Sequence, residues 1–217
     1  MKQTQFDKHT IAWFKIADYV SRGEKERALG VYRLLSHSFN DNAIARQLEA
    51  DIYCSFGETE QAIVLYQQAM DNYYKSERFF EAAAVGEHLI VLCSDDINLR
   101  RTLVQLYISL CMVGKIKSHI VALVNFIAKK QQWYDVKTVI AECSRMSQVN
   151  ERIIIYAQVI ISMYQINYPR DVLADSIRQL LNDSCFIDDK ISQQEFLELL
   201  LACSNELYEY VVVYIEK

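Results

Sequence analysis

Histidine is the residue type through which this sequence could most readily support acid–base or metal chemistry. The four histidines, His9, His37, His88 and His119, are far apart, and none belongs to an H-E-x-x-H pair or lies near a nucleophile elbow. The chain also lacks G-x-x-x-x-G-K-[ST] and G-x-G-x-x-G, the glycine patterns that cradle phosphate groups. We therefore predict a protein that is not an enzyme, with no catalytic residue and no cofactor.

Cysteine offers no better candidate for chemistry. The six cysteines include no C-x-x-C pair, and no histidine stands at metal-ligand spacing from them: Cys54, Cys93, Cys111, Cys143, Cys185 and Cys203. We interpret them as small buried residues of a reduced compartment and predict no metal site.

One segment, 188–196, has the pattern of the second half of a calcium-binding loop. If Glu195 is taken as the twelfth position of such a loop, Ser184 and Phe186 fall where oxygen ligands are needed. Too few ligands remain, and the turn glycine is missing. The better interpretation is a helix start, with Ser192 as the N-cap and Glu195 completing a capping box.

The composition favours helices. Hydrophobic residues make up 52% of the 217 residues and charged residues 24%, which excludes extensive disorder. Only five glycines and one proline are present, fewer than the many turns of an all-β protein require. We predict an all-α fold in a single domain, 1–217.

The charge pattern argues against nucleic acid as a general partner. The formal net charge is -5, so no global positive field attracts a phosphate backbone or an acidic membrane. The charge is uneven: 170–217 is acidic, whereas 115–137 contains a strip of lysines, Lys115, Lys117, Lys129, Lys130 and Lys137. A local lysine strip usually forms a solvated face, and RNA or DNA binding through it is the less favoured alternative.

No segment indicates a membrane or secretory protein. The N-terminal residues 1–9 are polar and lack the basic-then-apolar order of a secretory signal. No apolar run approaches the roughly 18 residues that a membrane span needs. We expect a cytoplasmic location and no membrane span.

An internal repeat appears when the N-terminal segment is shifted by 34 residues. The shift superposes Tyr19 on Tyr53, Gly23 on Gly57, Ala28 on Ala62 and Tyr32 on Tyr66. Each glycine stands where a first helix should stop, because glycine enters the left-handed conformation without a side-chain penalty. Each alanine lets paired helices approach closely, and each tyrosine, four residues later, adds apolar area to the same seam.

This order of small residue, tyrosine, glycine, alanine and aromatic resembles the tetratricopeptide repeat (TPR) family. The resemblance is clear over 9–74 and implies helix pairs stacked into a right-handed superhelix, a TPR-like α-solenoid. Beyond residue 76 the signature decays, but helical periodicity continues through degenerate hairpins over 77–182.

Periodicity and stop signals place ten helices, which form about five antiparallel pairs. They are expected near 7–22, 24–37, 41–56, 59–75, 77–93, 96–113, 115–130, 132–146, 150–167 and 170–182. Asp95 and Asp96 are expected to cap a helix start. Gly114 is expected to repeat the glycine stop between two helices.

The C-terminal part contains two further expectations. Residues 153–164 are apolar nearly all round, which indicates either a helix buried on several sides or the seam of a homodimer through 150–167. Residues 183–217 are expected to cap the stack, with a helix near 193–204. The Val- and Tyr-rich end could be a strand, but no partner strand is evident, so we prefer a last helix.

The resemblance to TPR proteins implies a concave groove, lined by first helices, that holds a partner peptide. In this register the groove positions are Trp13, Ala17, Val20 and Ser21 in the first repeat and Gln47, Asp51, Cys54 and Ser55 in the second. Trp13 suits either a binding anchor or end-capping core. The family's clamp for chaperone C-terminal carboxylates needs basic and amide side chains that these positions lack.

The leading hypothesis is thus a protein-interaction module, an adaptor or a client-binding chaperone, that grips a partner polypeptide. The alternative is a structural subunit of a larger assembly or homo-oligomer, docked through 150–167 or the C-terminal segment.

Overall fold

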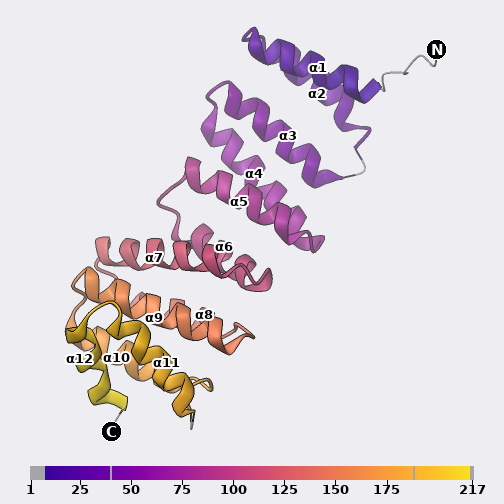
Figure 1. Cartoon of the computed structure of the whole chain (residues 1–217). Coiled ribbons are helices and arrows are strands. Elements are labelled where there is room, and N and C mark those ends of the chain that lie inside the picture. Colours follow the sequence, from indigo (N-terminus) through magenta and orange to yellow (C-terminus); the bar gives the residue numbers. More distant parts are fainter. Residues whose placement is uncertain (1–7, 40, 188, 216–217) are drawn as a thin grey trace. The chain divides into compact units, whose positions relative to one another are not determined.

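The described chain folds into α-helices throughout. The computed structural model describes residues 8–39, 41–187 and 189–215, and within these ranges no strand occurs. The α-helices are α1 (Lys8–Ser21), α2 (Lys25–Ser36), α3 (Asn42–Ser55), α4 (Thr59–Lys75), α5 (Phe79–Leu92), α6 (Ile97–Ser109), α7 (Val113–Lys129), α8 (Val136–Cys143), α9 (Val149–Gln165), α10 (Arg170–Leu181), α11 (Lys190–Leu201) and α12 (Asn205–Ile215) (Figure 1). The prediction of an all-α protein is confirmed.

The helices belong to two compact units, 1–94 and 95–217. Unit 1 contains α1 to α5, and unit 2 contains α6 to α12. The boundary after Ser94 falls inside the third predicted hairpin, between α5 and α6. The single domain over 1–217 stays a prediction, and each unit is described by itself below.

The first ten predicted helices match observed helices to within a few residues, with one exception. The segment expected as one helix over 132–146 begins with a 3₁₀ turn, Trp133–Asp135, and continues as the shorter helix α8. A tighter turn of this kind is common at the start of a helix.

Within the described ranges, six helices end in the same left-handed turn. Gly23 and Gly57 adopt φ angles of 73° and 75°, as the sequence predicts. The turn is closed by a pair of hydrogen bonds: at α3, Gly57 N–H donates to Cys54 O and Glu58 N–H donates to Tyr53 O. The other four turns place a residue with a side chain at the left-handed position: Glu77, Cys111, Gln131 and Asn167. The turn therefore recurs where its glycine signal has been lost.

The expected glycine stop at Gly114 is wrong. Gly114 is the second residue of α7, and the left-handed residue between α6 and α7 is Cys111, with φ of 53°. Met112 N–H then donates to Tyr107 O and completes the turn. Because hydrogen bonds to the end of the preceding helix decide the turn, a nearby glycine does not mark it.

The core of unit 1 is built on the small and aromatic positions of the repeat. Ala28 and Ala62 are completely buried, so α2 and α4 approach the helices beside them closely. Tyr32 and Tyr66 are nearly buried and add most of their ring area to the same contacts. The repeat register thus coincides with the packing of helices α1 to α4.

In unit 2, alternate helices pack side by side in two rows. Helix α9 contacts α7 and α11, while α10 contacts α8 and α12 (Figure 1). The apolar segment of α9 is enclosed by these neighbours, and its buried residues are Ile153, Ile155, Tyr156, Ala157, Val159, Ile160 and Met163. Packing inside the unit therefore accounts for most of the apolar surface of this helix, while Ile154 remains 39% exposed.

The C-terminal segment is a helical pair, α11 and α12, so the preference for a helix over a strand is confirmed. Helix α11 begins at Lys190, three residues earlier than expected, and its N-cap is Asp189 rather than Ser192. Asp189 accepts hydrogen bonds from the backbone N–H groups of Ile191 and Ser192 and from the Ser192 hydroxyl. The Asp189 carboxylate satisfies the first free N–H groups of α11, and the positive end of the helix dipole attracts its negative charge. Asp96 caps α6 in the same way, as predicted.

Candidate functional site

The predicted binding positions of the first repeat lie on α1. Trp13 and Ala17 are exposed and Val20 is partly buried. The Trp13 side chain is 41% exposed, and its ring lies 6.5 Å from that of Phe39, centroid to centroid. Trp13 is therefore packed on one side and open to solvent on the other.

The predicted positions of the second repeat lie on α3. Asp51 and Ser55 are exposed, whereas Gln47 and Cys54 are partly buried. The Ser55 hydroxyl donates to the backbone carbonyl of Asp51 at 2.7 Å, which leaves the Asp51 side chain for other partners. These four positions follow one side of the helix.

Two tyrosines of α4 hold the polar side chains of this face. Tyr66 Oη donates to Asp51 Oδ1 at 2.5 Å, and Tyr73 Oη donates to Gln47 Oε1 at 2.9 Å. Burial, together with the neighbouring Asp51 carboxylate, raises the pKa of Tyr66, so its phenol stays a neutral donor. The ring of His88 packs edge-on against Tyr66 at 4.7 Å. Asp51 is thus anchored through one oxygen, and no described residue bonds to its Oδ2.

Helix α3 has two open sides. Ala43 and Ala50 are buried on one flank, and Leu48 and Ile52 on the other. An α-helix turns about 100° per residue, so these flanks alternate with two strips that are less buried and are contacted mainly by tyrosine side chains of α2 and α4. Asp51 lies on one open strip, and the opposite strip faces a cleft.

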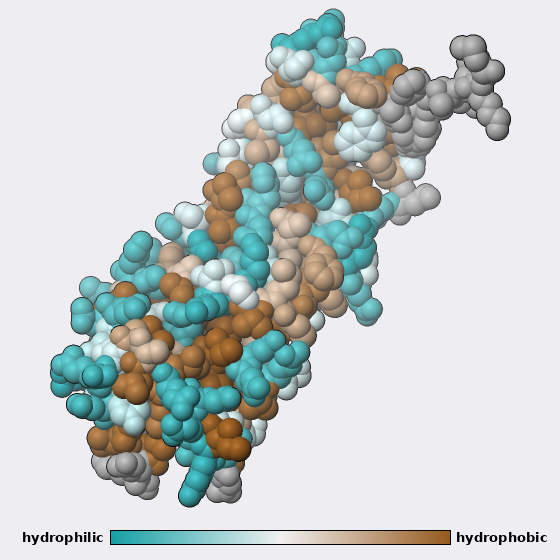
Figure 2. Space-filling view, viewed as in Figure 1, coloured by the Kyte–Doolittle hydropathy of each residue, from teal (hydrophilic) through white to brown (hydrophobic). Residues whose placement is uncertain are grey.

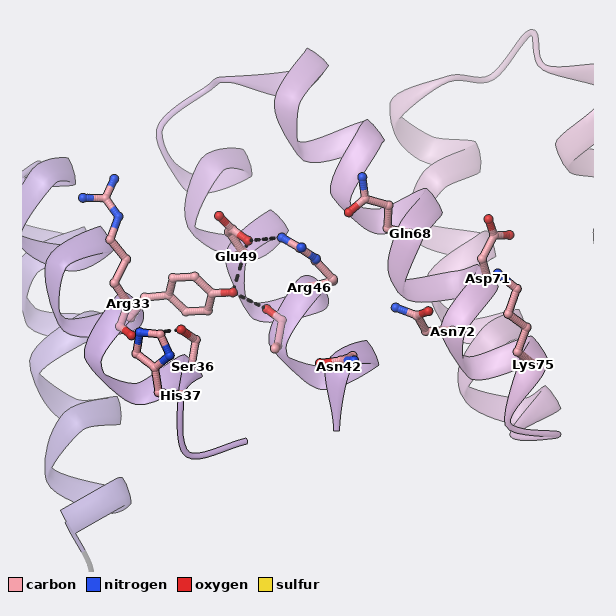
Figure 3. Close-up of a pocket in the computed structure, with 12 residues that line it drawn as sticks. Arg33, Ser36, His37, Asn42, Arg46, Glu49, Gln68, Asp71, Asn72 and Lys75 are labelled. Atoms are coloured by element: carbon pink, nitrogen blue, oxygen red, sulfur yellow. Dashed lines mark hydrogen bonds and ion pairs between the residues drawn. The ribbon is translucent and has the colours of Figure 1, made fainter. Parts of the chain in front are cut away.

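This cleft has a volume of about 690 Å³ and lies among α2, α3 and α4 (Figure 3). Its lining is predominantly polar: Tyr32, Arg33, Ser36, His37, Asn42, Ala45, Arg46, Glu49, Gln68, Asp71, Asn72 and Lys75. Figure 3 shows the α3 residues in the middle, between the α2 residues on one side and the α4 residues on the other.

A hydrogen-bonded group stiffens one wall of the cleft. The Tyr32 hydroxyl lies 3.0 Å from the carbonyl oxygen of Ala45 and 3.1 Å from Glu49 Oε2. Arg46 donates to the same Glu49 oxygen at 3.0 Å. Burial and then the Glu49 carboxylate raise the pKa of Tyr32, so the phenol remains protonated. This wall is therefore preorganised and nearly neutral.

Other groups that line the cleft are open. Among the described residues, none hydrogen-bonds to the side-chain amides of Asn42, Gln68 and Asn72, and none forms an ion pair with Arg33 or Lys75. The cleft thus offers donors and acceptors to a ligand without first breaking contacts of its own.

Sequence reasoning missed the cleft because its residues have no shared spacing. They come from the ends of two second helices and the start of a first helix, between Tyr32 and Lys75. Polar residues at such places are usual on any solvated helix. The amides Asn42, Gln68 and Asn72 were the available signal, but they become informative only after the helices are placed.

The lysines of 115–137 do not act as one free strip. Lys115 lies over the ring of Tyr107 and Lys130 over that of Phe126. Lys137 forms an ion pair with Asp175 at 3.1 Å and lies over Tyr134. Several of these charges are therefore already in contact with the protein.

Neither buried cysteine is prepared for nucleophilic chemistry. Burial raises the thiol pKa of Cys143, and burial followed by the Asp183 carboxylate raises that of Cys185 to about 12. Both stay protonated near neutral pH, where only a thiolate would attack. The expectation that all cysteines are buried is wrong for Cys111 and Cys203, which are exposed.

The described ranges contain neither a cluster of metal ligands nor a helix that could span a membrane. No group of three or more His, Cys, Asp or Glu side chains in these ranges could hold a metal ion. Within the same part of the chain, every helix is too short or too polar to cross a membrane.

Comparison with known proteins adds little to this geometry. No family model matches the sequence. No curated protein matches it either. Among solved structures, the chain is similar to "Crystal structure of BtubC (BKLC) from P. vanneervenii", with 8% identity and a TM-score of 0.27 over 99% of this chain and 93% of that one. A TM-score this low establishes neither fold nor function.

Proposed function

We propose that this protein is a non-enzymatic protein-interaction module, an adaptor or a client-binding chaperone of the cytoplasm. In this proposal the helix pairs form a TPR-like right-handed superhelical stack, and a partner polypeptide binds along the face of α1 and α3. The proposal rests on the 34-residue register of the sequence and on the side chains that this register places at Trp13 and Asp51.

The observation that carries the proposal is the state of Asp51. A carboxylate whose one oxygen is held by a buried tyrosine has little conformational freedom left to lose. A partner's donor can therefore bind the other oxygen at a small entropic cost. On α1, the half-exposed Trp13 offers the large amphipathic contact typical of binding anchors. An apolar anchor and an oriented charge together suit a polypeptide segment.

The test is purification of the protein from its own cells under native conditions, with identification of any partner present at near-equal amount. Trp13→Ala combined with Asp51→Asn should release that partner while leaving helicity intact. Asparagine can still accept the Tyr66 hydrogen bond but has no charge. Glu60→Gln, at an exposed position on α4, is the matched control and should retain the partner.

Two outcomes count against this binding face. Retention of a stoichiometric partner by the double variant would remove α1 and α3 from the interface. Unfolding by Trp13→Ala alone would show that the indole is part of the core.

A structural subunit of an assembly remains the second candidate, because large apolar side chains are exposed in the C-terminal segment. Ile191 is 75% exposed and Val213 50%. Figure 2 shows hydrophobic residues gathered on the surface of unit 2. Ile154 and Leu199 line a hollow between α9 and α11. These features favour a neighbour, or a second copy, docked on unit 2. Nucleic-acid binding through 115–137 is less favoured, since Lys137 is already paired.

A further inference from the structure

The polar cleft among α2, α3 and α4 has no part in the proposed binding face. Its α3 residues include Asn42 and Arg46, which lie on nearly the opposite side of the helix from Asp51 at about 100° per residue. A ligand in the cleft would therefore not compete with a partner held by Asp51.

The open groups of the cleft are chiefly amides. Asn42 comes from α3, and Gln68 and Asn72 come from α4 (Figure 3). A side-chain amide presents a donor and an acceptor next to each other, as a peptide group does. Amides on these two neighbouring helices can therefore bond to the N–H and C=O groups of an extended chain, whatever its side chains are. Recognition through the main chain is an established way of holding peptides.

The cleft is also continued at one end. An adjoining hollow of about 410 Å³ shares Asn42, Asn72 and Lys75 with it and extends to Ser76 and Arg78. Two connected hollows with amides at their junction suit an extended segment better than a compact small molecule.

The charged side chains of the cleft indicate the charge of the ligand. Arg46 is paired with Glu49, and Arg78 is paired with Asp41. The remaining charges without an ion pair among the described residues are the cations Arg33 and Lys75 and the acid Asp71. Cations outnumber acids, so an acidic segment is favoured over a basic one.

We propose that this cleft is a second polypeptide-binding site, which holds an extended acidic segment of a partner through its main chain. The site goes beyond the proposed function, because it uses another face of α3 and a different chemistry. With both faces occupied, one helix would bridge two polypeptide segments.

The probe is a capped peptide of alternating aspartate and alanine, about eight residues long so that it spans the cleft when extended. It is titrated into the intact ¹⁵N-labelled protein, and the side-chain amide signals of Asn42, Gln68 and Asn72 are followed by NMR. These signals should shift together and saturate. Signals that stay in place up to millimolar peptide would overturn the proposal.

Variants then test the contacts. Asn42→Ala, Gln68→Ala and Asn72→Ala combined should weaken binding by about tenfold or more, because several hydrogen bonds are lost. Gln67→Ala removes the neighbouring amide on α4, which is exposed and outside the cleft, and should leave the affinity unchanged. Circular dichroism confirms that each variant is folded. Equal losses in Gln67→Ala and the triple variant would refute the assignment.

Two altered probes separate the main chain from the charge. Replacing alternate peptide amides by esters removes N–H donors and should weaken binding about fivefold or more. A lysine–alanine peptide of the same length should bind more weakly than the aspartate peptide. Full affinity of the ester peptide would reject main-chain recognition, and equal affinity of the lysine peptide would reject the acidic preference.

The outcome is distinguishable from that of the proposed function. Trp13→Ala and Asp51→Asn should leave the affinity for the aspartate peptide unchanged. If they abolish it, the peptide binds the α1 and α3 face and the cleft is not a separate site.

Discussion

At the residue scale, Arg152 and Asp183 form an ion pair largely shielded from solvent, with side-chain exposures of 10% and 9%. Arg152 donates to Asp183 Oδ1 at 2.7 Å and to the carbonyl oxygen of Met146. Tyr156 Oη donates to Asp183 Oδ2, and the Cys185 N–H to Oδ1. This one carboxylate therefore ties the segment after α10 to helix α9.

Replacing this carboxylate should be costly. Asp183→Asn leaves Arg152 buried without its counter-charge, and we expect the free energy of unfolding to fall by about 3 kcal/mol. Urea denaturation followed by circular dichroism measures the change. Asp175→Asn, in the exposed pair with Lys137, is the control and should have a much smaller effect. Equal effects of the two changes would contradict the special role of Asp183.

The ion pair of Arg152 and Asp183 also makes the loss of unfolding free energy in Asp183→Asn depend on pH. Burial alone would raise the pKa of Asp183, but hydrogen bonds from Cys185, Tyr156 and Arg152 outweigh it and hold the pKa below the ordinary 3.8. A lowered pKa contributes stability above the ordinary value, and this is lost as the pH falls through the lowered one. The difference in the free energy of unfolding between the unaltered protein and Asp183→Asn should therefore shrink below about pH 3.8.

At the element scale, the recurring feature is the left-handed turn that ends α1, α3, α4, α6, α7 and α9. Gly23 and Gly57 adopt this conformation without a side-chain penalty, whereas Gln131, with φ of 57°, does not. The hydrogen bonds of the turn, such as that from Gln132 N–H to Ile127 O, hold the chain there in spite of the strain.

This strain can be relieved. Gln131→Gly should raise the free energy of unfolding by about 0.5–1 kcal/mol, because relief of the left-handed strain exceeds the added entropy of the unfolded chain. Gly57→Ala is the reciprocal change and should lower it by about 1 kcal/mol. Both are measured by urea denaturation. A destabilised Gln131→Gly would mean that the glutamine side chain makes a contribution larger than the strain.

At the scale of the whole molecule, two compact units carry separate candidate surfaces. The polar cleft and the face of α1 and α3 belong to unit 1, while the exposed apolar side chains of the C-terminal segment belong to unit 2. Most apolar residues of α9 are buried inside unit 2, and Ile154, at 39% exposed, is the part of this helix that a second copy could cover.

Light scattering tests this reasoning directly. We expect the intact chain to have the mass of one copy, 25.3 kDa, at micromolar concentration. A stable mass of two copies that falls to one in Ile191→Lys would instead support the homo-oligomer docked through the C-terminal segment. The exposed position of Ile191 makes it a suitable site, since the change should not affect the core.

The helices were predictable because they depend on local signals. Apolar periodicity located α1 to α7, and Asp96 was predicted to begin α6 because a carboxylate before a helix can satisfy its first N–H groups. The same kind of reasoning chose Ser192 where the structure uses Asp189, because two capping residues stand three apart and the Asp189 carboxylate accepts the first N–H groups of α11. The eight predicted positions on α1 and α3 still await a binding measurement.

The sequence alone determined that the chain is helical, where most helices run, and that glycine ends two of them, since each property follows from residues within a few turns of one another. Only the tertiary structure decided the rest. It placed left-handed turns at residues other than glycine and buried most of α9 among its neighbours. It also brought Asn42, Gln68 and Asn72 together in one cleft. These features depend on contacts between helices, and the spacing of residues along the chain does not record which helices meet.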